Sequence, residues 1–223
     1  TELHIDLPLS KNGKVTKQAS SMVVARMFSE TASSLEDIEL FNKFSICYKT
    51  ITLTTQGNRT EDTKFLKVDF QEWTDKKINF ESSSIYSFFA EQKFLFAIFS
   101  EQKSNDLYEN NVFLGFKRIS FDDEFLTTEV QKTWKRVREL VNGKKLINEK
   151  IYKKDGSPKM NKTGIQQEAP NLPKSKSYAV FLRGSGSDST KKPLAINGVQ
   201  MYYQNFWLKG SYLVDLLSNV DYL

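Results

Sequence analysis

Apolar and polar positions along the chain predict helices toward both ends and strands between them. Apolar residues at roughly helical spacing predict helices, and short apolar runs or alternating positions bounded by polar turns predict strands. The predicted helices cover residues 14–29, 82–92, 121–142 and a segment near 210–219. The predicted strands cover residues 43–55, 65–70, 93–102, 107–121, 177–184 and 199–203.

The helix over residues 121–142 has the strongest end signals. Ser120 and Asp123 form a capping-box-like start, and Gly143 suits the C-terminal end. Its apolar positions lie on one face, so we expect that face to be buried.

These elements predict the α+β class, with a mostly antiparallel mixed sheet flanked by helices. We expect the strand over 43–55 to pair with the strand over 65–70, and 93–102 to pair with 107–121. The expected organisation is a single domain over residues 1–223, which begins with a helical segment over 1–35.

Composition narrows the possible chemistry. The chain has 223 residues with one cysteine, Cys47, and one histidine, His4. One cysteine forms no internal disulfide, and one histidine makes a zinc cluster or a Ser-His-Asp triad hard to assemble. With no signal-like start and no apolar run long enough to cross a bilayer, we expect a cytoplasmic protein without a membrane partner.

Positive charge is concentrated in residues 144–176, here called the basic segment. This segment contains nine lysines and three acidic residues, so its net charge is nine minus three, or +6, compared with +5 for the whole chain. Glycines and prolines punctuate it, which predicts a flexible loop that either is simply solvated or contacts a polyanion. The lysines are Lys144, Lys145, Lys150, Lys153, Lys154, Lys159, Lys162, Lys174 and Lys176.

The strand over 43–55 raises the question of metal-dependent chemistry. Cys47 and Lys49 share a face of a strand, as the last carboxylate and the lysine of many nuclease sites do. Magnesium prefers oxygen ligands, however, and a thiol stands where a carboxylate is wanted. The alternative interpretation of Lys49 is a surface lysine beside a small, buried cysteine.

Two later segments are candidates for nucleic-acid contact. Arg183 ends a predicted strand before a Gly/Ser loop, where it either reaches a guanine edge or forms a surface ion pair. Trp207 and Lys209 belong to the aromatic and basic run "YYQNFWLKGSY", which suits nucleic acid but is also typical of a core. The loop "GSGSDST" lacks the Lys-Ser/Thr ending of a phosphate-binding loop.

Taken in order, several segments resemble the MutH-type endonucleases, in particular the second half of two-part type II restriction enzymes that cut GATC. The resemblance runs through most of the chain. It is carried by "KNGKVTKQASSMVVARMF", "SICYKTITL", "LKVDFQEW", "EQKFLFAIF", "FLGFKRISF", "VQKTWKRVRELVNGK", "AVFLRG" and "QNFWLKGSYLVDLL".

The resemblance implies a degenerate catalytic motif. Catalytic members carry Asp…Glu-X-Lys on the first core strand; here the Glu position falls on Cys47, the Lys position on Lys49 and the Asp position at or near Leu40. It therefore implies a MutH-like DNA-binding domain without catalytic residues or a bound metal. Magnesium would belong to a catalytic N-terminal half of the same enzyme.

The resemblance also implies DNA-binding residues. The arginine of the family's recognition loop falls on Arg183, with Gly184 and Ser185 in place of proline and lysine. An aromatic-Leu-Lys element falls on Trp207 and Lys209. The implied function is an allosteric domain that recognises GATC in double-stranded DNA.

Two alternatives remain. One is a self-sufficient magnesium-dependent endonuclease with relocated carboxylates, from Glu36, Asp37, Glu39 or Asp69. The other is a protein-interaction scaffold that has lost DNA binding.

Overall fold

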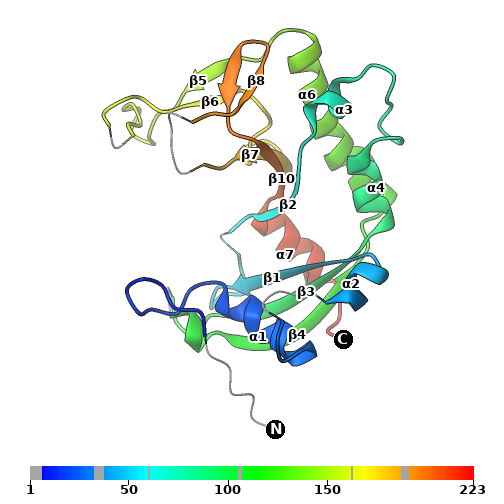
Figure 1. Cartoon of the computed structure of the whole chain (residues 1–223), viewed down its shortest axis with the longest axis vertical. Coiled ribbons are helices and arrows are strands. Elements are labelled where there is room, and N and C mark those ends of the chain that lie inside the picture. The colour runs from blue at the N-terminus through cyan, green and yellow to red at the C-terminus, as the bar shows by residue number, and fades with distance from the viewer. Residues whose placement is uncertain (1–6, 33–37, 60, 105–106, 162, 187–190) are drawn as a thin grey trace. The chain divides into compact units, whose positions relative to one another are not determined.

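The computed structural model of the chain describes residues 7–32, 38–59, 61–104, 107–161, 163–186 and 191–223 (Figure 1). His4, Glu36, Asp37 and Lys162 lie outside these ranges. The described part combines helices and strands in the α+β class. It contains no helix that is long and apolar enough to cross a membrane.

The chain divides into two compact units, each assembled from separate stretches of sequence. Unit 1 comprises residues 1–61, 88–121 and 210–223, and unit 2 comprises residues 62–87 and 122–209.

Unit 1 is built on a three-stranded sheet in the order β1-β3-β4. β3 pairs with β1 in parallel and with β4 antiparallel. The apolar run of β3 is buried because this strand is central and both of its faces are covered. The elements are α1 (Ala19–Phe28), α2 (Glu39–Lys43), β1 (Ile46–Leu53), β3 (Lys93–Ser100), η2 (Tyr108–Asn110), β4 (Val112–Ile119) and α7 (Gly210–Ser218).

One face of this sheet holds a cluster of buried side chains from the N-terminal helices and the strands. Val24 and Ala25 of α1 pack with Phe41, Tyr48 and Phe99. On the C-terminal side, the Lys117 ammonium donates to the carbonyl of Leu217 at the end of α7 (2.9 Å). Helix α1 thus packs on the sheet, and α7 is hydrogen-bonded to β4.

Unit 2 contains a second three-stranded sheet, fully antiparallel, in the order β2-β10-β7. Two short hairpins, β5-β6 and β8-β9, belong to the same unit. The elements are β2 (Thr63–Lys67), α3 (Phe70–Thr74), α5 (Asp123–Phe125), the π-helical turn η3 (Leu126–Val130), α6 (Gln131–Asn142), β5 (Asn148–Lys150), β6 (Glu168–Pro170), β7 (Val180–Gly184), β8 (Leu194–Ile196), β9 (Val199–Met201) and β10 (Gln204–Leu208). Helix α4 (Ser84–Glu91) spans the boundary between the units.

One predicted pairing is confirmed and one is wrong. The strands β3 and β4 pair as the sequence predicts. The strand over 65–70 does not pair with the strand over 43–55: β1 pairs with β3, and β2 pairs with β10 near the C-terminus. These two strands follow each other in the sequence but are not neighbours in a sheet. β2 belongs to unit 2, where Phe65 is buried, and β1 belongs to unit 1.

The long helix also begins differently from the prediction. Asp122, rather than Ser120, is the N-cap residue, and its carboxylate accepts a hydrogen bond from the backbone N–H of Phe125 (2.8 Å). The first helix, predicted to begin at residue 14, begins at Ala19, because Val15 forms a bridge with Leu9 around the Asn12-Gly13 turn.

Candidate nucleic-acid interface

The sheet β2-β10-β7 carries cations and aromatic rings on one face. In antiparallel strands, directly opposite residues share a face. Trp207 lies opposite Phe181 and Lys64, and Asn205 lies opposite Arg183 and Lys67. We call this surface the basic–aromatic face; its accessible residues are Lys64, Lys67, Arg183, Tyr203 and Trp207, with the buried side chains of Phe181 and Asn205 among them.

The opposite face of the same sheet is buried against helices. The ring of Phe206 lies edge-on to Trp73 of α3, with centroids 6.0 Å apart. The Thr133 hydroxyl of α6 donates to the carbonyl of Val180. Because the helices cover that side, the basic–aromatic face is the side that presents exposed lysines, Lys64 and Lys67.

A bulge in the sheet brings these two lysines to the same face. The register between β2 and β10 shifts between Asn205 and Trp207, so Lys64 and Lys67, three residues apart, both share a face with β10 residues. Strict alternation would put them on opposite faces. The Lys67 ammonium also lies over the ring of Tyr203, 3.5 Å from its centroid.

Arg183 and Trp207, which the sequence places 24 positions apart, meet on this face. The Arg183 guanidinium lies 4.9 Å from the ring centroids of both Trp207 and Phe181. Its Nη2 donates to the Asp62 carboxylate at 2.6 Å, and the Trp207 indole N–H donates to the Arg183 carbonyl at 3.2 Å. The surface ion pair left open by the sequence is therefore present, and it orients the guanidinium across aromatic rings.

The other two predicted DNA contacts lie at the ends of β7. Ser185 directly follows this strand and is exposed. Lys209 is also exposed, and its backbone N–H donates to the carbonyl of Ala179 (2.8 Å), beside the start of β7. Arg183 and Lys209 therefore mark opposite ends of the sheet, about 13 Å apart along the strand direction.

The residues of the degenerate catalytic motif lie in unit 1. Cys47 and Lys49 occupy alternate positions of β1, where both are half-buried. Leu40 lies in α2, outside the strand that carries Cys47 and Lys49. Ser45, with a left-handed φ of 50°, separates α2 from the strand.

Two of the carboxylates considered as replacements have structural partners. Glu39 pairs with Lys43 within α2 (2.8 Å), and Asp69 caps α3 by accepting hydrogen bonds from the N–H groups of Gln71 and Glu72. In the part of the chain that the structure describes, no three or more His, Cys, Asp or Glu side chains gather as a metal site would require.

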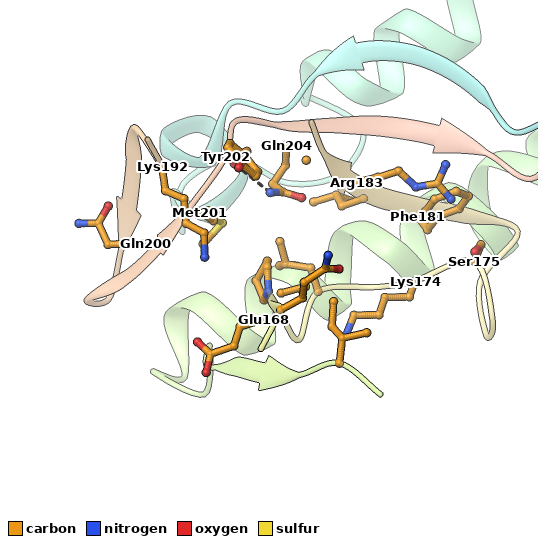
Figure 2. Close-up of a pocket in the computed structure, with 17 residues that line it drawn as sticks. Glu168, Lys174, Ser175, Phe181, Arg183, Lys192, Gln200, Met201, Tyr202 and Gln204 are labelled. Atoms are coloured by element: carbon orange, nitrogen blue, oxygen red, sulfur yellow. Dashed lines mark hydrogen bonds between the residues drawn. The ribbon is translucent and has the colours of Figure 1, made fainter. Parts of the chain in front are cut away.

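A pocket of about 500 Å³ runs along the outer edge of β7 (Figure 2). It is lined by residues of β6, β7 and β9 and by the loop between β6 and β7. Arg183 and Phe181 line it as well, so the pocket adjoins the basic–aromatic face.

The basic segment is folded into short ladders rather than an irregular loop. β5 pairs with β6, and isolated bridges join Tyr152 to Pro158 and Met160 to Gln166. Each isolated bridge encloses a turn. The Asp155 carboxylate accepts from the hydroxyl and N–H of Ser157, and the Asn161 side chain accepts in the same way from Thr163. These hydrogen bonds from Ser157 lower the pKa of the Asp155 carboxyl.

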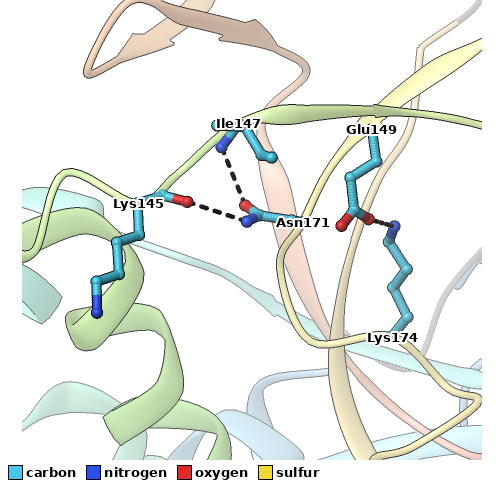
Figure 3. Close-up of polar contacts among 5 residues, drawn as sticks. All are labelled: Lys145, Ile147, Glu149, Asn171 and Lys174. Carbon is cyan, nitrogen blue, oxygen red and sulfur yellow. Dashed lines mark hydrogen bonds and ion pairs between the residues drawn. The ribbon is translucent and has the colours of Figure 1, made fainter.

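Asn171 joins the beginning of this segment to its end by hydrogen bonds (Figure 3). Its side-chain amide donates to the carbonyl of Lys145 (3.0 Å) and accepts from the N–H of Ile147 (3.1 Å). Nearby, the Lys174 ammonium pairs with the Glu149 carboxylate at 2.9 Å. Hydrogen bonds and an ion pair thus connect the beginning and the end of the segment that carries these lysines.

Comparison with known proteins adds no relative. No protein-family model and no curated protein matches this chain.

Lys64 and Lys67 of this face were not identified from the sequence, nor was Asp62, the partner of Arg183. The reason is that β2 was paired with the wrong strand and β10 was not recognised as a strand. The available signal was the pattern of "TKFLK", in which two lysines flank the buried Phe65.

Proposed function

We propose that this chain is a non-catalytic DNA-binding domain of MutH-like fold, which recognises GATC in double-stranded DNA as the allosteric part of a type II restriction endonuclease. The observation that carries the proposal is the basic–aromatic face, where Lys64, Lys67 and an oriented Arg183 share one surface with Trp207.

The charges of this face suit a nucleic-acid backbone. Exposed lysines neutralise phosphates and release counterions, which supplies affinity without sequence preference. Lys64 and Lys67 would take this role, joined by Lys209 and the exposed lysines of the basic segment. The segment's β-ladders would hold those lysines in place.

Arg183 would supply part of the specificity. A guanidinium has five N–H donors in a fixed plane, and one of its amino groups already donates to Asp62. The stacking on Trp207 and the Asp62 carboxylate limit its orientations, and the remaining donors suit the O6 and N7 acceptors of guanine. The entropy lost on binding is correspondingly reduced.

The assignment as non-catalytic has separate support. β1 reads Ile46-Cys-Tyr-Lys-Thr-Ile-Thr-Leu53 and carries no carboxylate beside Lys49. Magnesium would instead be held by the catalytic half of the parent enzyme. Occupation of this domain by DNA would then shift a conformational equilibrium of that half, which is the requirement for allostery.

A binding experiment tests the proposal directly. The purified chain should bind GATC duplexes more tightly than scrambled duplexes, and its affinity should fall steeply with salt. Equal affinity for both sequences would overturn the specificity, and no binding at low salt would favour the protein-interaction scaffold. Magnesium-dependent nicking of GATC plasmid by this chain would favour the self-sufficient nuclease with relocated carboxylates.

A further inference from the structure

The pocket along β7 adjoins the basic–aromatic face, and Phe181 and Arg183 line it. The proposed function gives this pocket no role. β7 is the edge strand of its sheet, so side chains from both of its faces reach the pocket. The walls are mainly apolar, and a volume of about 500 Å³ lies within the range of small-molecule sites. Apolar lining residues include Ile151, Pro170, Leu172, Phe181 and Met201.

A buried amide provides hydrogen-bonding groups in these walls. The Gln204 side chain is 3 % exposed and points from β10 toward the pocket (Figure 2). Its Nε2 donates to the carbonyl of Tyr202 at 2.8 Å, and its Oε1 accepts no hydrogen bond from any residue that the structure describes. An amide oxygen that lines a pocket can accept a hydrogen bond from a ligand that enters it.

Gly184 makes this position of the amide possible. It lies opposite Gln204 in the β7–β10 ladder. A Cβ atom at residue 184 would come within 2.5 Å of the Gln204 Nε2 and 3.0 Å of the Tyr202 Cβ. The absence of a side chain at this position therefore leaves the amide room beside the pocket.

Three cations and one carboxylate, that of Glu168, line the pocket, so its charge favours a ligand that carries an anion. Lys174 pairs with Glu149, and Arg183 pairs with Asp62. Lys192 also lines the pocket and forms no ion pair with a described residue. Its ammonium is therefore the cation best able to meet a phosphate.

We propose that the pocket along β7 binds a nucleobase that carries a phosphate, with the Gln204 amide on the base edge and Lys192 on the phosphate. A carboxamide presents a donor and an acceptor side by side, which matches base edges. The apolar walls suit the ring. The group has two possible sources: a base extruded from bound DNA, which rests on the proposed function, or a free nucleotide.

Two binding arms distinguish these sources. In the first, fluorescence anisotropy compares a fully paired GATC duplex with one that has an unpaired adenine beside the site. Extrusion of an unpaired base costs less, so we expect affinity for the second duplex to be about tenfold higher. In the second arm, calorimetry measures the binding of each free deoxynucleoside monophosphate.

Variants tie the result to the pocket. Gln204→Met keeps the side-chain volume, and Ala169→Trp fills the pocket from half-buried β6, so a folding defect in one leaves the other informative. Both should abolish the preference for the unpaired base, or the nucleotide binding, while binding to paired DNA is unchanged. Lys192→Ala should weaken the same signal, whereas the adjacent Lys191→Ala, outside the pocket, should not.

The outcomes separate the two proposals. Preference for the unpaired base that Gln204→Met removes identifies DNA as the source. Nucleotide binding without any duplex binding would support the pocket and overturn the proposed function. GATC binding with neither signal, or with signals that both pocket variants retain, would overturn the pocket and leave the proposed function standing.

Discussion

Arg183 is the residue whose surroundings say most about recognition. It combines a carboxylate partner, Asp62, with aromatic rings beneath its guanidinium. An ion pair whose arginine side chain is 44 % exposed contributes little to stability, because solvent screens the attraction. Its geometry is therefore better explained by the orientation it imposes than by the stability it adds.

Arg183→Ala should reduce the preference for GATC over scrambled DNA by about tenfold or more, since a guanine contact contributes about 1–3 kcal/mol of discrimination. Arg136→Ala is a matched control, because Arg136 has the same 44 % side-chain exposure and also pairs with a carboxylate, Glu139. Competition binding at constant salt measures both. A loss of preference that is equal in the two variants would contradict a reading role for Arg183.

The burial of Tyr48 predicts how the stability of the fold depends on pH. It is 9 % exposed, and this burial raises the pKa of its phenol, while the hydrogen bond with Thr50 (2.7 Å) lowers it by a smaller amount. In the unfolded chain the phenol loses its proton near pH 10.0, and in the folded chain it keeps it to higher pH. Above about pH 10 the stability therefore falls, by at most about 1.4 kcal/mol per pH unit.

Tyr48→Phe should remove this contribution. Urea unfolding at about pH 8 and about pH 11 should show a smaller loss of stability in the variant than in the parent chain. Other tyrosines and lysines titrate in both proteins, so their effects cancel in the comparison. Equal losses would show that Tyr48 ionises in the folded state as readily as in the unfolded chain.

At the scale of elements, the side chain of Asn171 connects the two ends of the basic segment. Asn171→Ala removes hydrogen bonds to Lys145 and Ile147, each of which contributes about 0.5–1.5 kcal/mol. We expect amide hydrogen exchange at Ile151, which donates to the carbonyl of Gln167, to accelerate about tenfold. Asn219→Ala, at an exposed position of unit 1, is the control. Unchanged exchange in Asn171→Ala would contradict a closing role for this residue.

Local patterns predicted several elements well. The apolar run of β3 and the one-sided apolar face of α6 give strong signals, because burial on both faces and on one face leave different periodicities. The ladders of the basic segment were missed. Its turns depend on hydrogen bonds that the side chains of Asp155 and Asn161 accept, which charge and glycine content do not reveal.

Long-range pairing was the main limit on predicting the site. Arg183 and Trp207 were both predicted as DNA contacts, but nothing in the sequence placed them on adjacent strands. Lys64 was missed because its face is set by the bulge opposite β10, far along the chain. The roles of Ser185 and Lys209 stay predictions, since exposure alone does not assign them.

At the scale of the molecule, the nuclease-like strand and the basic–aromatic face belong to different compact units. β1, with Cys47 and Lys49, is part of unit 1, whereas both partner strands of β10 are in unit 2. In the proposed function, DNA binding by unit 2 therefore does not require catalytic residues in unit 1. The net charge of +5 adds a general attraction to polyanions, so only a matched comparison isolates the face itself.

The most direct test reverses charge on that face. Lys64→Glu/Lys67→Glu alters two exposed lysines three residues apart, and Lys132→Glu/Lys135→Glu makes the same change on exposed positions of α6, which lies against the other side of the sheet. The measurement is affinity for a GATC duplex as a function of salt concentration. We expect the first variant to lose affinity strongly and its salt dependence to fall by about two phosphate contacts, while the second changes little. Equal weakening of both variants, or full binding by the first, would contradict the assignment of the basic–aromatic face to DNA.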